Sequence, residues 1–293
     1  MTRRIVLVTH PQRSAVPALA EELTRRLDEH GIAVEVLEAP QDGTTPQLAG
    51  ETTGVELVVV LGGDGTILRG AGVARDLEVP VLGVNLGRVG FLAEAEREEM
   101  SEVTERIAAR DYTVEERMTL EVDINRDGEL VGHNWALNEA SVEKSARERM
   151  LEVTVEIDGR PLSTWGCDGV VMSTPTGSTA YAFSGGGPIV WPDVQALLVV
   201  PISAHALFAR PLVLGPDTHL AVEVVPHGNV TGVMWCDGSR TTDLPPGARV
   251  EVRRSTIPVR LARLNTWSFT DRLVAKFALP VQGWRGRPEA GGA

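Results

Sequence analysis

Residues 55–72, VELVVVLGGDGTILRGAG, carry a run of aliphatic residues directly into a turn of three glycines and one aspartate. Residues 55–61 predict a buried strand, and the residues from about Gly65 to Arg75 predict a helix. A strand that ends in glycines and passes straight into a helix is typical of an open α/β sheet, which binds ligands at its carboxyl edge. Because the glycines let a phosphate approach the backbone and the helix directs free amides at the same point, the stretch predicts a phosphate-binding turn.

Asp64 is the unusual residue of this turn, because a carboxylate has the wrong charge to grip a phosphate. Its chemistry suits accepting a proton from a hydroxyl nucleophile or helping to hold a magnesium ion. Arg69, one helical turn beyond Gly65, could reach a phosphate. The alternative is a plain turn in which Asp64 caps the helix, and the turn alone leaves both interpretations open.

The first 112 residues alternate between strand and helix patterns. Continuous aliphatic runs at 4–8, 33–39, 55–61 and 80–85 predict strands, and 15–31, 65–75 and part of 96–111 predict helices. Such alternation indicates a parallel sheet covered on both faces. We therefore expect an α/β fold that starts with a Rossmann-like parallel-sheet domain.

From about residue 113 the hydrophobic period changes to two, and Asp127-Gly128 and Asp158-Gly159 are strong hairpin signals. The second domain should be mostly antiparallel β, and a C-terminal helix at 270–279 should return to the first domain. The expected division is 1–112 plus about 268–293 for the α/β domain, and 113–267 for the β-rich domain.

Composition excludes several classes of protein. A net charge of −12 argues against a nucleic-acid partner, and no apolar stretch approaches the roughly 20 residues that cross a bilayer. Two cysteines fit a reducing compartment, so we expect a cytoplasmic protein with no membrane partner. The two lysines, Lys144 and Lys276, do not follow a glycine, which excludes a Walker-type loop. The dinucleotide fingerprint also fails, because its third glycine position is Leu68.

Residues 168–188, DGVVMSTPTGSTAYAFSGGGP, form a second and more specific pattern, with six hydroxyl side chains between 173 and 181. Hydroxyls and exposed amides at this density suit a ribose or a phosphate, and Tyr181 could stack on a flat ring. The alternative is a serine- and threonine-rich loop without a function. A third element, Asn138-Glu139, could bind an adenine edge or ribose hydroxyls, although this pair is common in proteins.

These three elements together, in this order and at these separations, resemble one family. The motifs GGDGT (62–66), NE (138–139) and 168–188 look like those of an NAD kinase. The resemblance extends to 83–94, 205–214 and 269–286, and so covers nearly the whole chain from about residue 4 to 286. GGDG alone is shared with diacylglycerol kinases, sphingosine kinases and phosphofructokinases, whereas the long motif singles out NAD kinases.

The resemblance implies an activity and a role for each matching residue. The activity is transfer of the terminal phosphoryl of ATP to the 2′-hydroxyl of the adenosine ribose of NAD, giving NADP, with Asp64 as the proton acceptor. Some relatives also use polyphosphate as donor, and Mg²⁺ or another divalent cation would come with the nucleotide, because no metal site is expected from protein residues alone. The expected binding residues are Gly63, Gly65, Arg69, Asn138, Glu139, Arg149, Asp168, Thr176, Thr179, Ala180, Tyr181, Ala182, Phe183 and Ser184.

Several points stay open at this level. Either Arg147 or Arg149 could be the basic binding residue that the family has after Asn138-Glu139. Some members of the family also carry a basic residue two positions before the aspartate that matches Asp168, where this chain has Gly166. The choice between ATP and polyphosphate, activity on NADH and feedback by NADP or NADPH are also open. The resemblance implies a homodimer or homotetramer, which no residue pattern specifies. A lipid kinase and a non-enzymatic nucleotide sensor remain the rival functions.

Overall fold

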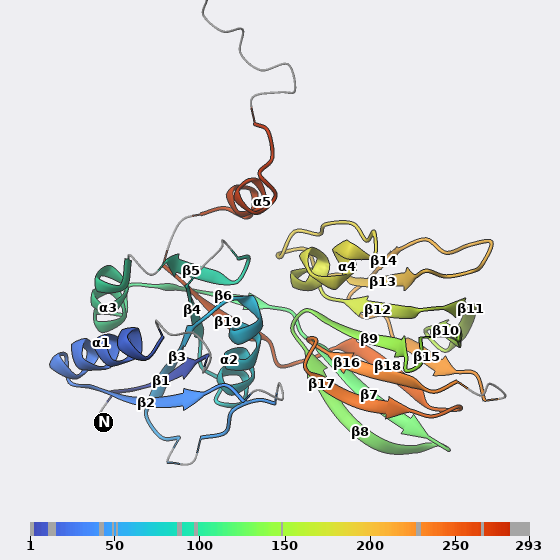
Figure 1. The fold of residues 1–293 in the computed structure, drawn as a ribbon, viewed down its shortest axis with the longest axis horizontal. Helices are drawn as coiled ribbons and strands as arrows, with labels where there is room; N and C mark the ends of the chain where they lie inside the picture. The colour runs from blue at the N-terminus through green and yellow to red at the C-terminus, as the bar shows by residue number, and fades with distance from the viewer. Residues whose placement is uncertain are drawn as a thin grey trace, which may run out of the picture.

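The computed structural model describes residues 3–10, 16–40, 44–48, 50, 52–86, 90–96, 99–147, 149–226, 230–264 and 267–281. Two parts lie side by side, one with helices around a sheet and one built mostly of strands (Figure 1). Among the described helices, none is both long enough and apolar enough to span a bilayer.

The first part is a seven-stranded sheet in the order β2-β1-β3-β4-β19-β6, with β5 also paired to β4. The pairs of this sheet are parallel except for β6 with β19. The strands are β1 (Arg3–Thr9), β2 (Ile32–Glu38), β3 (Val55–Leu61), β4 (Val81–Asn85), β5 (Ala93–Glu96), β6 (Thr113–Arg117) and β19 (Val259–Arg263), and the helices that cover them are α1 (Val16–Glu29), α2 (Asp64–Asp76) and α3 (Met100–Ala109).

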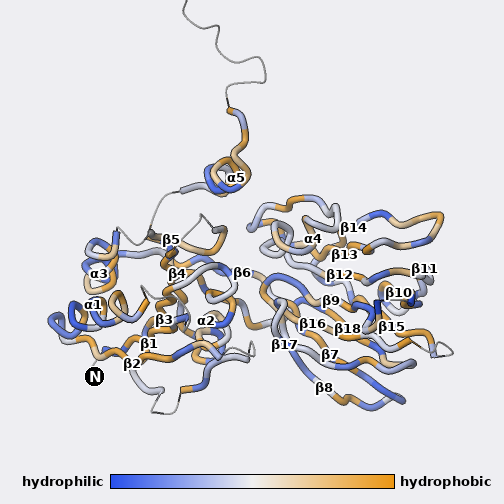
Figure 2. The backbone as a smooth tube through the Cα atoms, in the orientation of Figure 1, coloured by the Kyte–Doolittle hydropathy of each residue, from blue (hydrophilic) through white to orange (hydrophobic). Residues whose placement is uncertain are grey.

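The aliphatic runs of the central strands supply both faces of this sheet, because successive side chains point in opposite directions. Ile5 and Leu7 of β1 pack in a cluster with α1 and α3, whereas Val6 and Val8 pack in another cluster with α2. Figure 2 shows the apolar residues concentrated on β3 and β4, inside the layer of helices. The predicted parallel sheet with helices on both faces is therefore confirmed.

Strand membership adds detail to the expected order of elements. Strands β6 and β19 join the first sheet, although 113–117 and 259–263 lie within the range assigned to the β-rich part. Their alternating pattern predicts a strand but does not say which sheet it enters. Strand β5, only four residues long, was not predicted. Residues 282–293 of the expected C-terminal segment lie outside the described residues.

The second part consists of two six-stranded antiparallel sheets, β11-β10-β15-β18-β7-β8 and β14-β13-β12-β9-β16-β17, which share one apolar core. Both predicted hairpin turns are present, with positive φ at Asp127, Gly128, Asp158 and Gly159. The strands are β7 (Leu120–Arg126), β8 (Glu129–Ala136), β9 (Glu139–Lys144), β10 (Leu151–Ile157), β11 (Arg160–Cys167), β12 (Gly169–Ser173), β13 (Leu197–Ile202), β14 (Leu212–Leu214), β15 (Leu220–Val224), β16 (Gly232–Cys236), β17 (Arg240–Leu244) and β18 (Arg249–Arg254).

The last helix, α5 (Phe269–Phe277), begins at a capping box formed by Ser268 and Asp271. It returns to the first part, as expected, where Phe269 and Phe277 lie 5.8 and 6.1 Å from Phe91 between ring centroids. Phe277 also lies 4.8 Å from Phe183 of the second part. Helix α5 therefore contacts both parts of the molecule.

Candidate functional site

The turn after β3 places Asp64 at the start of α2. Helix α2 lies on the side of the first sheet that faces the second part (Figure 1). Gly63 is the N-cap residue and no side chain caps the helix. The Asp64 carboxylate instead accepts hydrogen bonds from the backbone N–H groups of Phe91 and Leu92, both at 3.4 Å. Asp64 is therefore not a helix cap, and the bonds from the described residues use two of the several acceptor positions on its two oxygens.

Gly90 determines how closely the backbone approaches Asp64. A Cβ atom at residue 90 would lie 2.2 Å from Oδ1 of Asp64, which is far inside van der Waals contact. The sequence analysis did not single out Gly90 as a site residue, although it lies in the 83–94 motif. Only glycine fits there without moving the carboxylate.

The sequence leads us to expect that Asp64 accepts a proton from a hydroxyl nucleophile. On that expectation, Gly90→Ala should lower kcat by about 10²-fold, because it would displace the carboxylate by about 1 Å from its alignment with the hydroxyl. The matched control is Gly215→Ala, because a Cβ there would meet only Thr218 Oγ1, at 3.8 Å. Steady-state kinetics and thermal unfolding of both variants provide the test. Equal kcat values in the two variants would show that the close approach at Gly90 is not needed.

The Asn138-Glu139 pair lies next to α2, where the turn after β8 enters β9 at Glu139. Leu137 packs in the same apolar cluster as Ile67 of α2, which brings the turn to the helix that begins with Asp64. The carbonyl oxygen of Asn138 accepts from Ser173 Oγ at 3.1 Å and from the Thr174 N–H at 2.9 Å. The structure therefore joins the pair to the loop that follows β12.

Glu139 is almost fully buried, with 7% of its surface exposed. Burial, and to a smaller extent the nearby charge of Asp237, raise its pKa to about 8, although a hydrogen bond from the Tyr181 backbone N–H opposes the shift. A carboxyl group with this pKa holds a proton at neutral pH. Glu139 can therefore donate a hydrogen bond as well as accept one.

Asp168 precedes β12 and forms an ion pair with Lys144, whose Nζ lies 2.5 Å from Oδ1. This contact lowers the pKa of Asp168. Lys144 was missed as a site residue by the sequence analysis, which looked for a basic residue at position 166. Lys144 is the last residue of the neighbouring strand β9. It lies beside Asp168 because the antiparallel register pairs Glu143 with Gly169.

The hydroxyl-rich loop contains two short helices, η2 (Thr176–Thr179) and α4 (Tyr181–Ser184). Several of its hydroxyls hold the loop itself in place. Thr174 Oγ1 donates to the carbonyl oxygen of Leu137 at 2.6 Å, and Ser178 Oγ bonds both the N–H and the carbonyl oxygen of Val190. The density of hydroxyls thus reflects loop architecture as much as ligand binding.

The expected binding residues of this loop differ in accessibility. Thr179, Ala180 and Tyr181 are half-buried and Ser184 is exposed, whereas Ala182 is fully buried in a small core with Val171 and Val200. Phe183 is exposed over 41% of its surface and contacts α5. The accessible groups for a ligand are therefore concentrated at residues 179–181 and 184.

Arg117 is a further residue that the sequence analysis missed. It is 5% exposed, and its Nη1 donates to Thr176 Oγ1 at 3.4 Å. Burial, together with the like charge of Arg263, lowers its pKa to about 10. Arg117 lines a cavity of about 510 Å³ between the two parts, together with residues of β6, β19 and α5.

The remaining basic candidates differ in their surroundings. Arg69 is half-buried on α2, and its Nε is buried without a hydrogen-bond partner among the described residues. Arg147 and Arg149 are both exposed, so the choice between them stays open. Gly65 is exposed and a Cβ there would meet nothing within 4 Å, which leaves the first turn of α2 accessible.

No protein metal cage is found at Asp64 within the described part of the chain. Among the described residues, a group of three side chains that could hold a metal lies elsewhere, on β7 and β8, and consists of Glu121, Asp123 and His133. Arg253 bonds both carboxylates of this group at 2.7 Å, so their negative charge is already partly neutralised. A divalent cation at Asp64 would therefore depend on the nucleotide phosphates for its remaining ligands.

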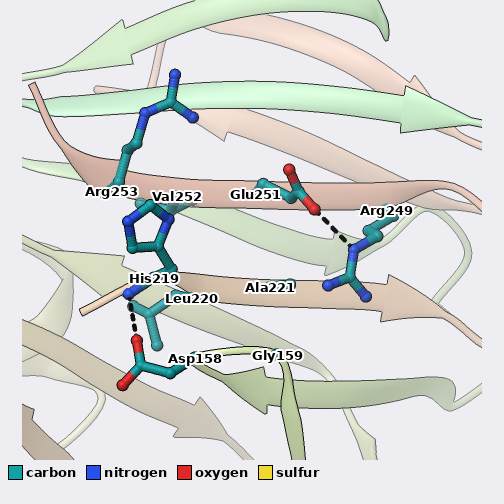
Figure 3. Close-up of a pocket in the computed structure, with 9 residues that line it drawn as sticks. All are labelled: Asp158, Gly159, His219, Leu220, Ala221, Arg249, Glu251, Val252 and Arg253. Atoms are coloured by element: carbon teal, nitrogen blue, oxygen red, sulfur yellow. Dashed lines mark hydrogen bonds and ion pairs between the residues drawn. The ribbon is translucent and has the colours of Figure 1, made fainter. Parts of the chain in front are cut away.

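A separate depression of about 450 Å³ lies over β15 and β18 and contains none of the expected binding residues (Figure 3). Asp158 accepts a hydrogen bond from the His219 N–H at 2.9 Å, and Arg249 donates to Glu251 at 2.9 Å. Arg249 and Glu251 are thus engaged with each other, and Asp158 with a backbone N–H.

Two family models match the chain. The ATP-NAD kinase N-terminal domain matches residues 5–112, and the ATP-NAD kinase C-terminal domain matches residues 137–264. Together they span more than half of the chain.

Relatives and solved structures agree with these matches. The chain is 61% identical over 296 residues to "NAD kinase 2" of Streptomyces coelicolor, covering 98% of each protein, and 50% identical over 304 residues to "NAD kinase" of Mycobacterium leprae, covering 97% of each. The crystal structure of yeast NADH kinase complexed with NADH has a TM-score of 0.82 at 24% identity, over 95% of this chain and 88% of that chain. An NAD kinase from Archaeoglobus fulgidus in complex with ATP has a TM-score of 0.69 at 24% identity, over 94% and 97% of the two chains. These structures share the fold, and the matched family models and relatives show that this chain belongs to the NAD kinase family.

Proposed function

We propose that this NAD kinase transfers the terminal phosphoryl of ATP to the 2′-hydroxyl of the adenosine ribose of NAD, and that Asp64 accepts the proton. The observation that carries the proposal is the Asp64 carboxylate, which begins α2 and, among the described residues, accepts two long hydrogen bonds from backbone N–H groups. A positioned general base typically contributes about 10²–10⁴ in rate.

In the proposed step, the 2′-oxygen forms a bond to the terminal phosphorus while the bond from that phosphorus to its bridging oxygen breaks. ADP leaves with the electron pair, and the hydroxyl proton moves to an oxygen of Asp64. Gly63 and Gly65 leave room for the phosphates, and the free N–H groups at the start of α2 face them. Arg69, on the same helix, supplies positive charge.

The rest of the nucleotide site is assigned to the second part. Asn138 and Glu139 are proposed to bind the adenine and ribose region of NAD, and residues 179–181 and 184 its adenosine. Asp168, oriented by Lys144, is proposed to bind the nicotinamide end. Thr176, bonded to Arg117, is proposed to support the loop next to the ligand.

A divalent cation, proposed to be Mg²⁺, would supply positive charge that offsets the negative charge of the donor phosphates, which this acidic chain does not balance. Asp64 is the residue of the turn that could supply it with an oxygen ligand. Phosphate oxygens and water would complete its coordination.

The deciding experiment measures transfer of radiolabelled phosphate from ATP to NAD. Parallel reactions replace NAD with NADH or with a diacylglycerol, and replace ATP with polyphosphate. Label is expected in NADP and not in the lipid. Label in the lipid and none in NADP would overturn the proposal, whereas the NADH and polyphosphate reactions define acceptor and donor range.

Removal of divalent cations is expected to abolish phosphate transfer without loosening the fold. Because the cation is proposed to arrive with the nucleotide, EDTA should stop the reaction, excess Mg²⁺ should restore it, and the Tm of the nucleotide-free protein should not change. Activity and thermal unfolding are measured with and without EDTA. A lower Tm in EDTA without nucleotide would show that the protein itself holds a metal.

The quaternary structure and location complete the proposal. We infer a homodimer or homotetramer formed through the second part, where Leu207, Phe208 and Val213 expose more than half of their surface. Light scattering after size exclusion tests this, and a monomer at all concentrations would contradict it. A cytoplasmic location is proposed because Cys167 and Cys236 are both free thiols.

A further inference from the structure

Asp237 lies in the turn of the β16–β17 hairpin, a position to which the proposed chemistry gives no role. Positive φ angles of 51° at Asp237 and 64° at Gly238 match the other two Asp-Gly turns. Its side chain nevertheless has 0% exposure, whereas that of Asp127 in a corresponding turn is 94% exposed. Turn formation does not require such burial, so the carboxylate has a further role.

The buried carboxylate bonds the backbone that leads into Asn138-Glu139. Its Oδ1 accepts from the N–H of Asn138 at 2.7 Å and from that of Leu137 at 3.0 Å, and Oδ2 also lies 3.0 Å from the Leu137 nitrogen. The backbone N–H of Asp237 donates to the carbonyl oxygen of Glu139 at 3.0 Å. One residue thus bonds three successive residues of a turn 100 positions earlier in the chain.

Arg240 connects this carboxylate to the helix that begins with Asp64. Its Nη2 lies 3.0 Å from Oδ2 of Asp237 and donates to the carbonyl oxygen of Trp135 at 2.6 Å. The Trp135 ring lies between two guanidinium groups, at 4.6 Å from Arg240 and 4.7 Å from Arg75 of α2. Stacked cations of this kind hold an aromatic ring in place.

We propose that Asp237 is a positioning residue of the nucleotide site, which fixes the Asn138-Glu139 turn relative to α2 through Arg240 and Trp135. This inference rests on the proposed nucleotide-binding role of Asn138 and Glu139. Asp237 itself does not touch the ligand, because its side chain is fully enclosed. Without its oxygens, buried N–H groups of residues 137 and 138 would lose their acceptor, which a folded chain relieves by moving the turn.

The same arrangement sets the charge around Glu139. The charged and titratable groups that face it are Asp237, Glu143 of β9, Cys236 of β16 and Tyr181 of α4, with Arg240 behind Asp237. The negative charge of Asp237 raises the pKa of Glu139, so neutralising Asp237 lowers it. Above its pKa Glu139 is ionised and can no longer donate a hydrogen bond. In the Asp237→Asn variant, Glu139 should therefore lose its ability to donate a hydrogen bond at a lower pH than in the unmodified protein.

The test compares Asp237→Asn with Asp158→Asn. Asp158 is a matched control, because it occupies the same kind of turn and accepts a backbone N–H from His219. Asp237→Asn is expected to raise the KM for NAD roughly tenfold, since a hydrogen bond to a buried charged group is lost, while kcat changes little. The KM for NAD is expected to change with pH as Glu139 ionises, which Glu139→Gln identifies, and the pH of this change should be lower in Asp237→Asn than in the unmodified protein. Asp158→Asn should change neither quantity.

Arg240→Lys is the second variant, to be measured if Asp237→Asn does not fold. It keeps the positive charge but loses the planar contacts of the guanidinium group with Trp135. It is expected to raise the KM for NAD without moving the pH of the change. An unchanged KM for NAD in either folded variant, or an unmoved pH in Asp237→Asn, would overturn the inference. Absence of NADP formation by the unmodified enzyme would instead overturn the proposed function.

Discussion

Asp64→Asn is expected to lower kcat for NADP formation by about 10²–10⁴, which is the range that a positioned general base contributes. Asparagine keeps the size of the side chain, and its one oxygen can still accept from Phe91 or from Leu92, whose N–H groups bond different oxygens of Asp64 at 3.4 Å. It cannot take a proton from the 2′-hydroxyl. The KM for NAD should change little, because the residues proposed to bind NAD lie elsewhere.

Three measurements make this result specific to proton transfer. The Tm of the Asp64→Asn variant should equal that of the unmodified protein, and direct titration should show unchanged NAD binding. Asp76→Asn, at the opposite end of α2, is a matched control with a carboxylate away from the turn. A kcat of Asp64→Asn within about threefold of the control would contradict a general-base role, given the range above.

Glu94→Gln is expected to have the largest effect on stability. Glu94 on β5 has a side chain that is 1% exposed and forms ion pairs with Arg263 of β19 and Arg272 of α5, which are 10% and 8% exposed. A neutral glutamine would leave these buried cations without this counter-charge. Breaking a buried pair in this way costs about 3–5 kcal/mol, because a charge stays buried without compensation.

Thermal and denaturant unfolding of Glu94→Gln measure this loss, with Glu29→Gln as the matched control. Glu29 pairs with Arg25, but both side chains are about 60% exposed. That exposed pair should contribute only about 0–1 kcal/mol. Equal free energies of unfolding in the two variants would show that the Glu94 network does not stabilise the joint between β5, β19 and α5.

The fold could be predicted from the sequence wherever the signal is local. The aliphatic run of β3 and the glycines that follow it define the parallel sheet and the Asp64 turn, and Asp-Gly pairs define hairpins. The sheet that β6 and β19 join could not be predicted, because an alternating strand carries no record of its neighbours. Helix α5 was expected on the first part, but its contact with Phe183 depends on how the two parts meet.

The candidate site divides in the same way. Asp64, Asn138 and Glu139 are recognisable by motif. Lys144 and Gly90 are not, because each acts on a residue at least 24 positions away in the chain, through strand register or close packing. The burial of Asp237 likewise depends on its contact with a segment 100 positions earlier in the chain, which no local pattern predicts.

The late position of β19 in the chain has a consequence for biosynthesis. Strand β4 leaves the ribosome long before its neighbour β19, because β4 ends at residue 85 and β19 begins at residue 259. At roughly 5–20 residues per second, the nascent chain spends on the order of ten seconds in this state. During that interval the aliphatic side of β4 is a site where chaperones can bind, and the enzyme can become active only once almost its entire length has been translated.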